Sequence, residues 1–97
     1  MKGIMKGIIR YIKSLFGKYE PGYEYWVYLR DIKISPEFER TPPRFKKMCQ
    51  KWSYYRNTGE FESPIILNRD FALIDGYTSY IIAKKSEMDK VPVYFVD

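Results

Sequence analysis

The sequence predicts a small α+β domain: a small mixed sheet with two core helices in the order β-α-β-β-α-β, preceded by an amphipathic basic helix. Three observations predict this architecture. The chain has 97 residues, a length that allows one compact domain. Short runs rich in aromatic and β-branched residues alternate with segments whose apolar residues recur at helical spacing. Apolar residues make up 45% of the chain and charged residues 30%, which excludes a disordered chain and a membrane span.

Residues 1–19 are predicted to form the basic helix. On a helical projection one broad face is apolar, and Gly17 ends the helix. The opposite face carries four bases, Lys2, Lys6, Arg10 and Lys13. Residues 1–19 hold five bases and no acid, whereas residues 20–97 hold 12 of each, so this segment carries the whole net charge of +5. Three roles are open to it: docking of its apolar face on the domain itself, contact with a membrane surface, and binding of a nucleic acid or a protein.

The domain is predicted to span residues 25–97, after a linker formed by residues 20–24. Glu20-Pro21-Gly22 marks the linker, because proline and glycine stop a helix and favour a turn. The run from Tyr25 to Ile34 is rich in aromatic and β-branched residues and predicts the first strand. The stretch from Ser35 to Pro43 holds three prolines and three charges and predicts a loop.

The first core helix is predicted to begin with Thr41 as its N-cap and with Pro42 and Pro43 in its first turn. Gly59 supplies its stop. Five apolar residues recur at helical spacing and form one stripe: Phe45, Met48, Cys49, Trp52 and Tyr55. The stripe predicts that Cys49 packs in the core and is not a reactive thiol.

The second half of the domain begins with a predicted hairpin. Pro64 to Leu67 and Phe71 to Ile74 are short apolar runs separated by Asn68-Arg69-Asp70, a composition typical of a tight turn. Gly76 then opens a second helix over about residues 77–86, and residues 91–96 form the last strand.

The composition excludes several kinds of enzyme. Without His, the chain lacks the commonest metal ligand and the commonest general base near neutral pH. A lone Cys allows neither an internal disulfide nor a thiolate zinc site, and it fits a reducing cytoplasm. Ser-His-Asp, Cys-His and zinc-hydrolase mechanisms are therefore excluded, and no catalytic residue, metal or cofactor is predicted. Asp75 is predicted to serve the turn before the second helix and not a metal.

Four segments in a fixed order resemble one known family. They are Ser63–Leu67, Ala72–Tyr80, Ala83-Lys84 and Val91-Pro92-Val93. The N-terminal domain of ParB partition proteins has a Pro-Ile strand, a hairpin, a Gly-Glu-Arg-Arg box opening a helix, and a final Val-Pro-Val strand in this order. Pro43-Arg44 also resembles the Pro-Arg of the family's first box. The resemblance covers about residues 29–97 and implies the ParB/sulfiredoxin fold.

The chain departs from the family at the box. Where ParB proteins have Glu-Arg-Arg after the glycine, this chain has Tyr77-Thr78-Ser79. Hydroxyls cannot replace the charge-assisted contacts by which two arginines hold a triphosphate, so triphosphate binding of the family type is not expected. Tyr77 also stands where sulfiredoxin has its catalytic Cys, which excludes that chemistry. Because the sequence ends at Asp97, operator reading by the helix-turn-helix domain of partition proteins is not expected.

Two candidate sites follow from the residues. Arg44, Gly76, Thr78 and Ser79 could bind an anion or nucleotide at a helix N-terminus, where exposed N–H groups attract negative charge. The alternative is that Gly76 makes the turn and Thr78 or Ser79 caps the helix. The second candidate binds nucleic acid or a partner through bases interleaved with aromatic residues: Lys46, Lys47, Lys51 and Arg56, with Trp52, Tyr54 and Tyr55. Its alternative is a solvated helix face whose aromatic rings point inward.

The favoured functional hypothesis is a non-catalytic ParB-like module that acts through a basic, aromatic surface. Its partner would be nucleic acid or a nucleic-acid-binding protein, contacted also by Lys2, Lys6, Arg10 and Lys13 of the N-terminal segment. By analogy, such a free-standing module would suit a regulator or inhibitor carried on a mobile element, such as an anti-CRISPR or partition-associated protein. The alternative is a reduced domain of the ParB type that binds or hydrolyses a nucleotide.

Overall fold

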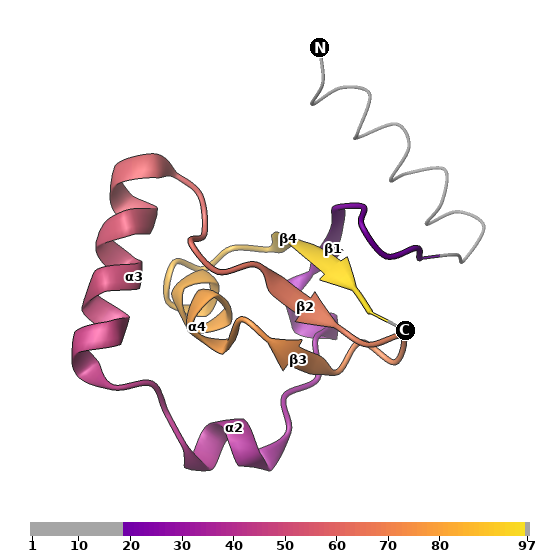
Figure 1. Cartoon of the computed structure of the whole chain (residues 1–97), viewed down its shortest axis with the longest axis horizontal. Coiled ribbons are helices and arrows are strands. Elements are labelled where there is room, and N and C mark those ends of the chain that lie inside the picture. Colours follow the sequence, from indigo (N-terminus) through magenta and orange to yellow (C-terminus); the bar gives the residue numbers. More distant parts are fainter. Residues whose placement is uncertain (1–18, 97) are drawn as a thin grey trace.

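A computed structural model of the chain describes residues 19–96 (Figure 1). Apart from Tyr19, the predicted basic helix lies outside the described residues. The described elements are β1 (Tyr25–Tyr28), the 3-10 helix η1 (Leu29–Asp31), α2 (Pro36–Arg40), α3 (Phe45–Thr58), β2 (Ile65–Leu67), β3 (Leu73–Asp75), α4 (Tyr77–Lys85) and β4 (Lys90–Phe95). Within residues 19–96, no helix is long and apolar enough to cross a membrane.

The four strands form one mixed sheet in the order β1-β4-β2-β3. The central strand β4 pairs antiparallel with β1 and parallel with β2, so that Val93 lies beside both Tyr25 and Ile65. β2 and β3 form the antiparallel hairpin. The predicted order of core elements and the mixed sheet are confirmed.

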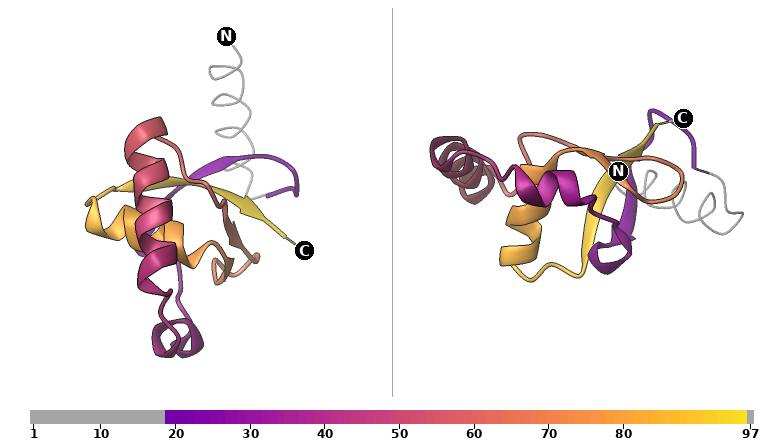
Figure 2. Two further views of the ribbon diagram at one scale, coloured as in Figure 1. Left: turned by 60° about the vertical axis from the view of Figure 1, so that its left-hand side comes forward. Right: turned by 90° about the horizontal axis from the view of Figure 1, so that it is seen from below.

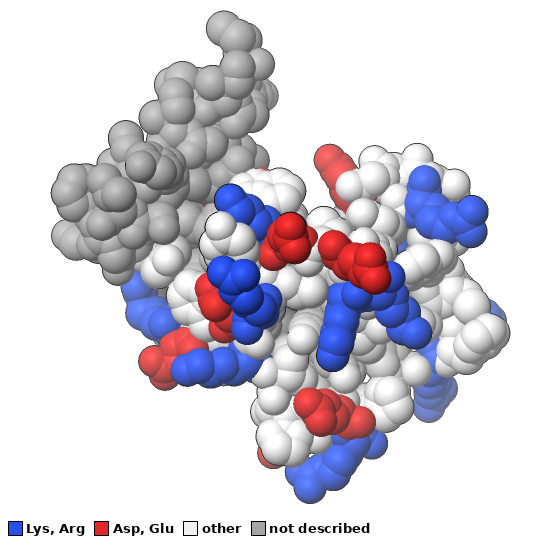
Figure 3. Space-filling view, turned by 180° about the vertical axis from the view of Figure 1, so that it is seen from behind, with Lys and Arg blue, Asp and Glu red and all other residues white. Residues whose placement is uncertain are grey.

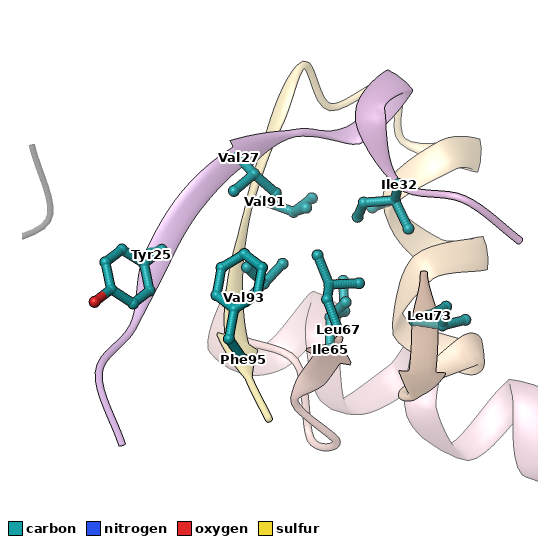
Figure 4. Close-up of a cluster of buried hydrophobic side chains, with 10 residues drawn as sticks. Tyr25, Val27, Ile32, Ile65, Leu67, Leu73, Val91, Val93 and Phe95 are labelled. Carbon is teal, nitrogen blue, oxygen red and sulfur yellow. The ribbon is translucent and has the colours of Figure 1, made fainter. Parts of the chain in front are cut away.

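Alternate residues of the strands build the core. In β1, Tyr25 and Val27 are buried while Trp26 and Tyr28 are exposed, as expected when side chains alternate between the two faces of a sheet. Figure 4 shows the buried side chains of the four strands meeting on one face, together with Ile32. Phe95 contacts three further rings, those of Tyr19, Tyr25 and Phe71.

The first strand is shorter than predicted. It ends at Tyr28, and residues 29–31 turn into η1. Tyr28 pairs with Lys90, the first residue of β4, so β1 has no ladder partner beyond this point. The chain leaves the sheet here, and Leu29 donates its backbone N–H to the Asp89 carbonyl at 2.8 Å. Lys33 then forms an isolated parallel bridge with Ala72.

The predicted loop contains a short helix, α2, and the predicted N-cap at Thr41 is wrong. Thr41 ends α2: its backbone N–H and its hydroxyl both donate to the Glu37 carbonyl, the hydroxyl at 2.7 Å. Pro36 occupies the first turn of α2, where its missing N–H costs nothing. Pro42 and Pro43 belong to neither helix, since the residue before a proline avoids the helical region and Thr41 and Pro42 each precede one. α3 therefore begins at Phe45, with Arg44 as its N-cap.

The core placement of Cys49 is also wrong. None of the 14 residues of α3 is buried, and Cys49 is exposed. The predicted apolar stripe exists as one face of the helix, but α4 lies between α3 and the sheet (Figures 1 and 2). The stripe therefore lies outside the core.

We expect Cys49 to react with a maleimide in the folded protein, at a rate within about tenfold of that of a free thiol at the same pH. Cys49→Ser should change the free energy of unfolding by less than about 0.5 kcal/mol, because the side chain is exposed. Labelling kinetics with and without denaturant provide the measurement. A thiol that reacts only after unfolding would contradict the exposed position.

The hairpin and the second core helix agree with the sequence. The Asn68 side chain accepts the N–H groups of Asp70 and Ala72, both at 2.9 Å, and so closes the turn between β2 and β3. Gly59 ends α3 and Gly76 begins α4, both in the left-handed backbone conformation. The φ angle of Gly76 is 89°. The last strand, β4, was predicted one residue later at each end.

Candidate functional site

Helix α3 is held to the domain by contacts of its middle and its C-terminal half. The Tyr55 ring stacks on Phe61 with centroids 5.4 Å apart, and its hydroxyl lies 3.7 Å from the Met88 sulfur. Lys51 forms an ion pair with Glu62 at 2.6 Å, donates to the Ser63 hydroxyl at 2.9 Å and is only 17% exposed. These contacts hold α3 in its orientation relative to the rest of the domain.

An open groove of about 600 Å³ runs between α3 and α4. Its lining consists of Phe45, Met48, Cys49, Trp52, Ser53, Arg56, Asn57 and Lys85. Phe45 is 83% exposed and Trp52 is half-buried, so two aromatic rings border the groove. Arg56 and Lys85 bring positive charge from both helices, and within the described part of the chain the lining holds no carboxylate. The groove is therefore cationic and aromatic.

The charged residues of α3 are all basic. Residues 41–59 contain five bases and no acid. Elsewhere the charges are mixed: seen from behind, Figure 3 shows acidic and basic side chains interspersed. Outside the first 19 residues, α3 is thus the segment where positive charge accumulates.

A second, smaller hollow of about 230 Å³ lies at the N-terminus of α4. Gly76 and Thr78 line it, and Lys47 reaches it from α3. The Asp75 carboxylate also lines it and accepts the Gly76 N–H at 2.8 Å. One backbone donor at this helix start is therefore already occupied by a negative group of the chain itself.

Tyr77, the first residue of α4, packs between aromatic neighbours. Its ring centroid lies 5.2 Å from that of Phe38 and 6.2 Å from that of Tyr80. Burial, and after it the nearby Glu39 carboxylate, raise the pKa of Tyr77 above its usual value. The phenol is therefore neutral at physiological pH, so it has no charge that would attract or repel a bound anion.

Two solved structures align with this arrangement of strands and helices. One is a pNOB8-like ParB-N domain in its C2221 crystal form, with a TM-score of 0.64 and 28% identity over 76% of this chain. Another structure of a pNOB8-like ParB N-domain gives a TM-score of 0.60 with 32% identity over 76% of this chain. The chain has a ParB-N-like fold. It spans 29% and 28% of the two chains that it matches.

The ParB-N-like fold is also shared with a more distant structure, the C-terminally truncated chromosome-partitioning protein ParB from Caulobacter crescentus complexed with CTP-gamma-S. The TM-score is 0.60 at 15% identity, over 78% of this chain and 45% of the other. No family model and no curated protein matches the sequence. The resemblance noted in the sequence is therefore confirmed at the level of the fold.

Two of the four residues of the predicted anion site lie together in the ParB-N-like domain. Gly76 and Thr78 line the hollow at the start of α4, whereas Arg44 and Ser79 are not among its lining. The Ser79 hydroxyl donates to the Ser63 carbonyl at 2.5 Å and so ties α4 to the chain before β2. Gly76 makes the turn into α4, as the alternative expected, and Ser79 does not cap the helix, because its hydroxyl donates to Ser63.

The predicted partner-binding residues also fall into different parts of the structure. Lys46 and Lys47 are exposed, and Trp52 lines the groove. Lys51 and Tyr55 instead attach α3 to the domain, through Glu62 and Phe61. The predicted partner-binding bases of the N-terminal segment lie outside the described residues: Lys2, Lys6, Arg10 and Lys13.

Lys85 was not among the predicted site residues, and Phe45 was predicted to lie in the core. Lys85 lies in the last turn of α4 and enters the same groove as Arg56 only because α4 packs against α3. No local pattern contains that contact. Among residues 19–96, no cluster of three His, Cys, Asp or Glu residues could hold a metal ion.

Proposed function

We propose that the chain is a non-catalytic ParB-like binding module that holds single-stranded nucleic acid in the groove between α3 and α4. One observation carries the proposal: a surface helix without acids and without buried residues borders a groove that combines aromatic rings with cations. Phosphates would pair with the cations, and unpaired bases would stack on the rings.

The positions of the side chains support this division of work. Arg56 belongs to α3 and Lys85 to α4, so a phosphate backbone entering the groove would meet a positively charged side chain from each helix. Phe45, at the start of α3, offers a largely exposed ring, and Trp52 lies further along the same groove. Stacking needs bases that are not paired, which favours a single strand over a duplex.

The test is titration of a labelled single-stranded oligonucleotide by fluorescence anisotropy over a range of salt concentrations. Arg56→Gln with Lys85→Gln should reduce the slope of log affinity against log salt by about 1.4, because each phosphate contact on a single strand contributes about 0.7. Phe45→Ala should weaken binding by about 1–3 kcal/mol through the lost stacking. It should leave the fold intact, since Phe45 is 83% exposed.

The matched control is Lys33→Gln with Lys90→Gln, which removes the same two charges from exposed positions that do not line the groove. The control should lower affinity less and keep the salt slope close to that of the unmodified protein. If control and groove variants behave alike, the groove does not bind the strand.

A regulator or inhibitor on a mobile element would act through such a groove, because it would occupy nucleic acid without converting it.

Nucleotide binding at the start of α4 is the second candidate. Lys47, Gly76 and Thr78 line one hollow, and the Caulobacter ParB structure is a complex with CTP-gamma-S. The Asp75 carboxylate at the Gly76 N–H opposes an incoming phosphate, so this candidate is the weaker one. Titration with CTP separates the two: saturable binding that Thr78→Val abolishes would favour the nucleotide site, and strand binding without CTP binding favours the groove.

A further inference from the structure

A hollow of about 470 Å³ on the outer face of the sheet is separate from the α3–α4 groove. Trp26 of β1 and Pro92 and Tyr94 of β4 supply its floor, because Trp26 and Pro92 are partners in the ladder and point away from the core. Phe61 and Tyr55 border it from the end of α3 and the following loop. Trp26 is 48% exposed, a large apolar surface for an otherwise folded domain.

We propose that residues 2–17 of the same chain dock in this hollow through their apolar face. The inference does not depend on nucleic-acid binding, which concerns a different surface. Three observations carry it: the charge of the hollow, the place where the segment joins the domain, and the length of the segment.

The charges of the two surfaces are complementary. Glu24 and Glu60 lie in the lining, and within residues 19–96 no Lys or Arg contributes to it. The N-terminal segment has the opposite composition, five bases without an acid in residues 1–19. A helix laid in the hollow by its apolar side would carry its bases on the opposite face, about one helix diameter from the two carboxylates, a distance close to the Debye length at which opposite charges still attract.

The described chain begins beside β1, on the core face of the sheet and opposite the face that carries the hollow. The Tyr19 ring packs on Tyr25 with centroids 5.1 Å apart and on Phe95 with centroids 4.3 Å apart. Tyr25 is the direct neighbour of both Glu24 and Trp26, and β1 is an edge strand. Three residues span at most about 10 Å, so residues 17–19 would be long enough to carry the chain around this edge to the outer face.

The length of the segment also suits the surface. A helix of residues 2–16 would be about 22 Å long, shorter than the 31 Å second dimension of the domain. Its apolar residues would then cover Trp26 and Tyr94, and its bases would remain on the outside.

The test uses the full chain with Trp52→Phe, so that Trp26 is the only indole. Ile8→Asp with Ile12→Asp disrupts the apolar face and should shift the emission of Trp26 to the red and increase its quenching by acrylamide. Lys6→Gln with Lys13→Gln alters only the polar face of the same segment and should change both signals much less than the two aspartates do, because it weakens the attraction between the surfaces but leaves the apolar contact intact. Equal quenching in all three proteins would overturn the proposal.

A second measurement locates the segment and identifies the chain that supplies it. A nitroxide on Ser14→Cys, outside the apolar face, in a Cys49→Ser background, should broaden the NMR signals of the Trp26 indole and the Tyr94 amide, but not those of Arg40 in α2. In a mixture of isotope-labelled chains without nitroxide and unlabelled chains with nitroxide, the broadening should disappear. Broadening that persists would mean that a second copy supplies the segment, which would overturn docking within one chain.

Discussion

Replacing Gly76 with alanine is expected to lower the free energy of unfolding by about 2–5 kcal/mol, because two costs add at this position. Gly76 has φ of 89°, a conformation that residues with a Cβ rarely adopt. A Cβ built here would lie 2.3 Å from the Pro64 carbonyl oxygen and 2.8 Å from the Ile65 Cα. Both atoms belong to the backbone, so neither can move aside without displacing β2.

Gly22→Ala is the matched control for this prediction. Gly22 has nearly the same φ, 87°, but no atom lies within 4 Å of its Cβ position. It should show only the conformational cost, about 1–2 kcal/mol. Urea denaturation of both variants separates the contribution of the close approach from that of the backbone angle. Equal losses would mean that β2 yields and that the contact between Pro64 and Gly76 contributes nothing.

Phe95→Ala is expected to lower the free energy of unfolding by about 3–5 kcal/mol. The ring is 1% exposed, and three other aromatic rings have centroids within 6 Å of its own. The loss would include both the buried area and the edge-to-face contacts with Tyr25 and Phe71. Thermal and urea unfolding monitored by circular dichroism provide the measurement.

The neighbouring Val96 supplies the comparison. It is 37% exposed, and Val96→Ala should cost less than about 1 kcal/mol. If Phe95→Ala unfolds too readily for a reliable measurement, Phe95→Leu retains most of the volume and should fall between the two variants. A loss at Phe95 no larger than that at Val96 would contradict the central place of the aromatic cluster.

The elements that the sequence predicted correctly are those with local signals. Gly59 and Gly76 stand where the chain needs a positive φ, and Asn68 closes a turn with its own side chain. These requirements act over a few residues and leave a readable pattern. The order of strands and helices follows from such signals placed one after another.

The errors arose where distant segments decide the outcome. β1 ends at Tyr28 because β4 begins at Lys90, which no pattern near Tyr28 records. The apolar stripe of α3 was read as a core face, although a stripe shows only that one side of a helix is apolar and not what covers it. The same reason explains why the core placement predicted for Cys49 is wrong. Lys51, predicted to contact nucleic acid or a partner, is bound instead to Glu62, whose position beside α3 depends on the fold of the following loop.

The position of β4 between β1 and β2 has a consequence for the order in which the chain can assemble during synthesis. β1 leaves the ribosome first, yet its only sheet neighbour begins at Lys90, so the strand stays unpaired for a time on the order of seconds. Only the β2–β3 hairpin can form from contiguous chain before that. During this interval the apolar side chains of Tyr25 and Val27 have no neighbouring strand to pack with, so the core can close only after β4 has been synthesised.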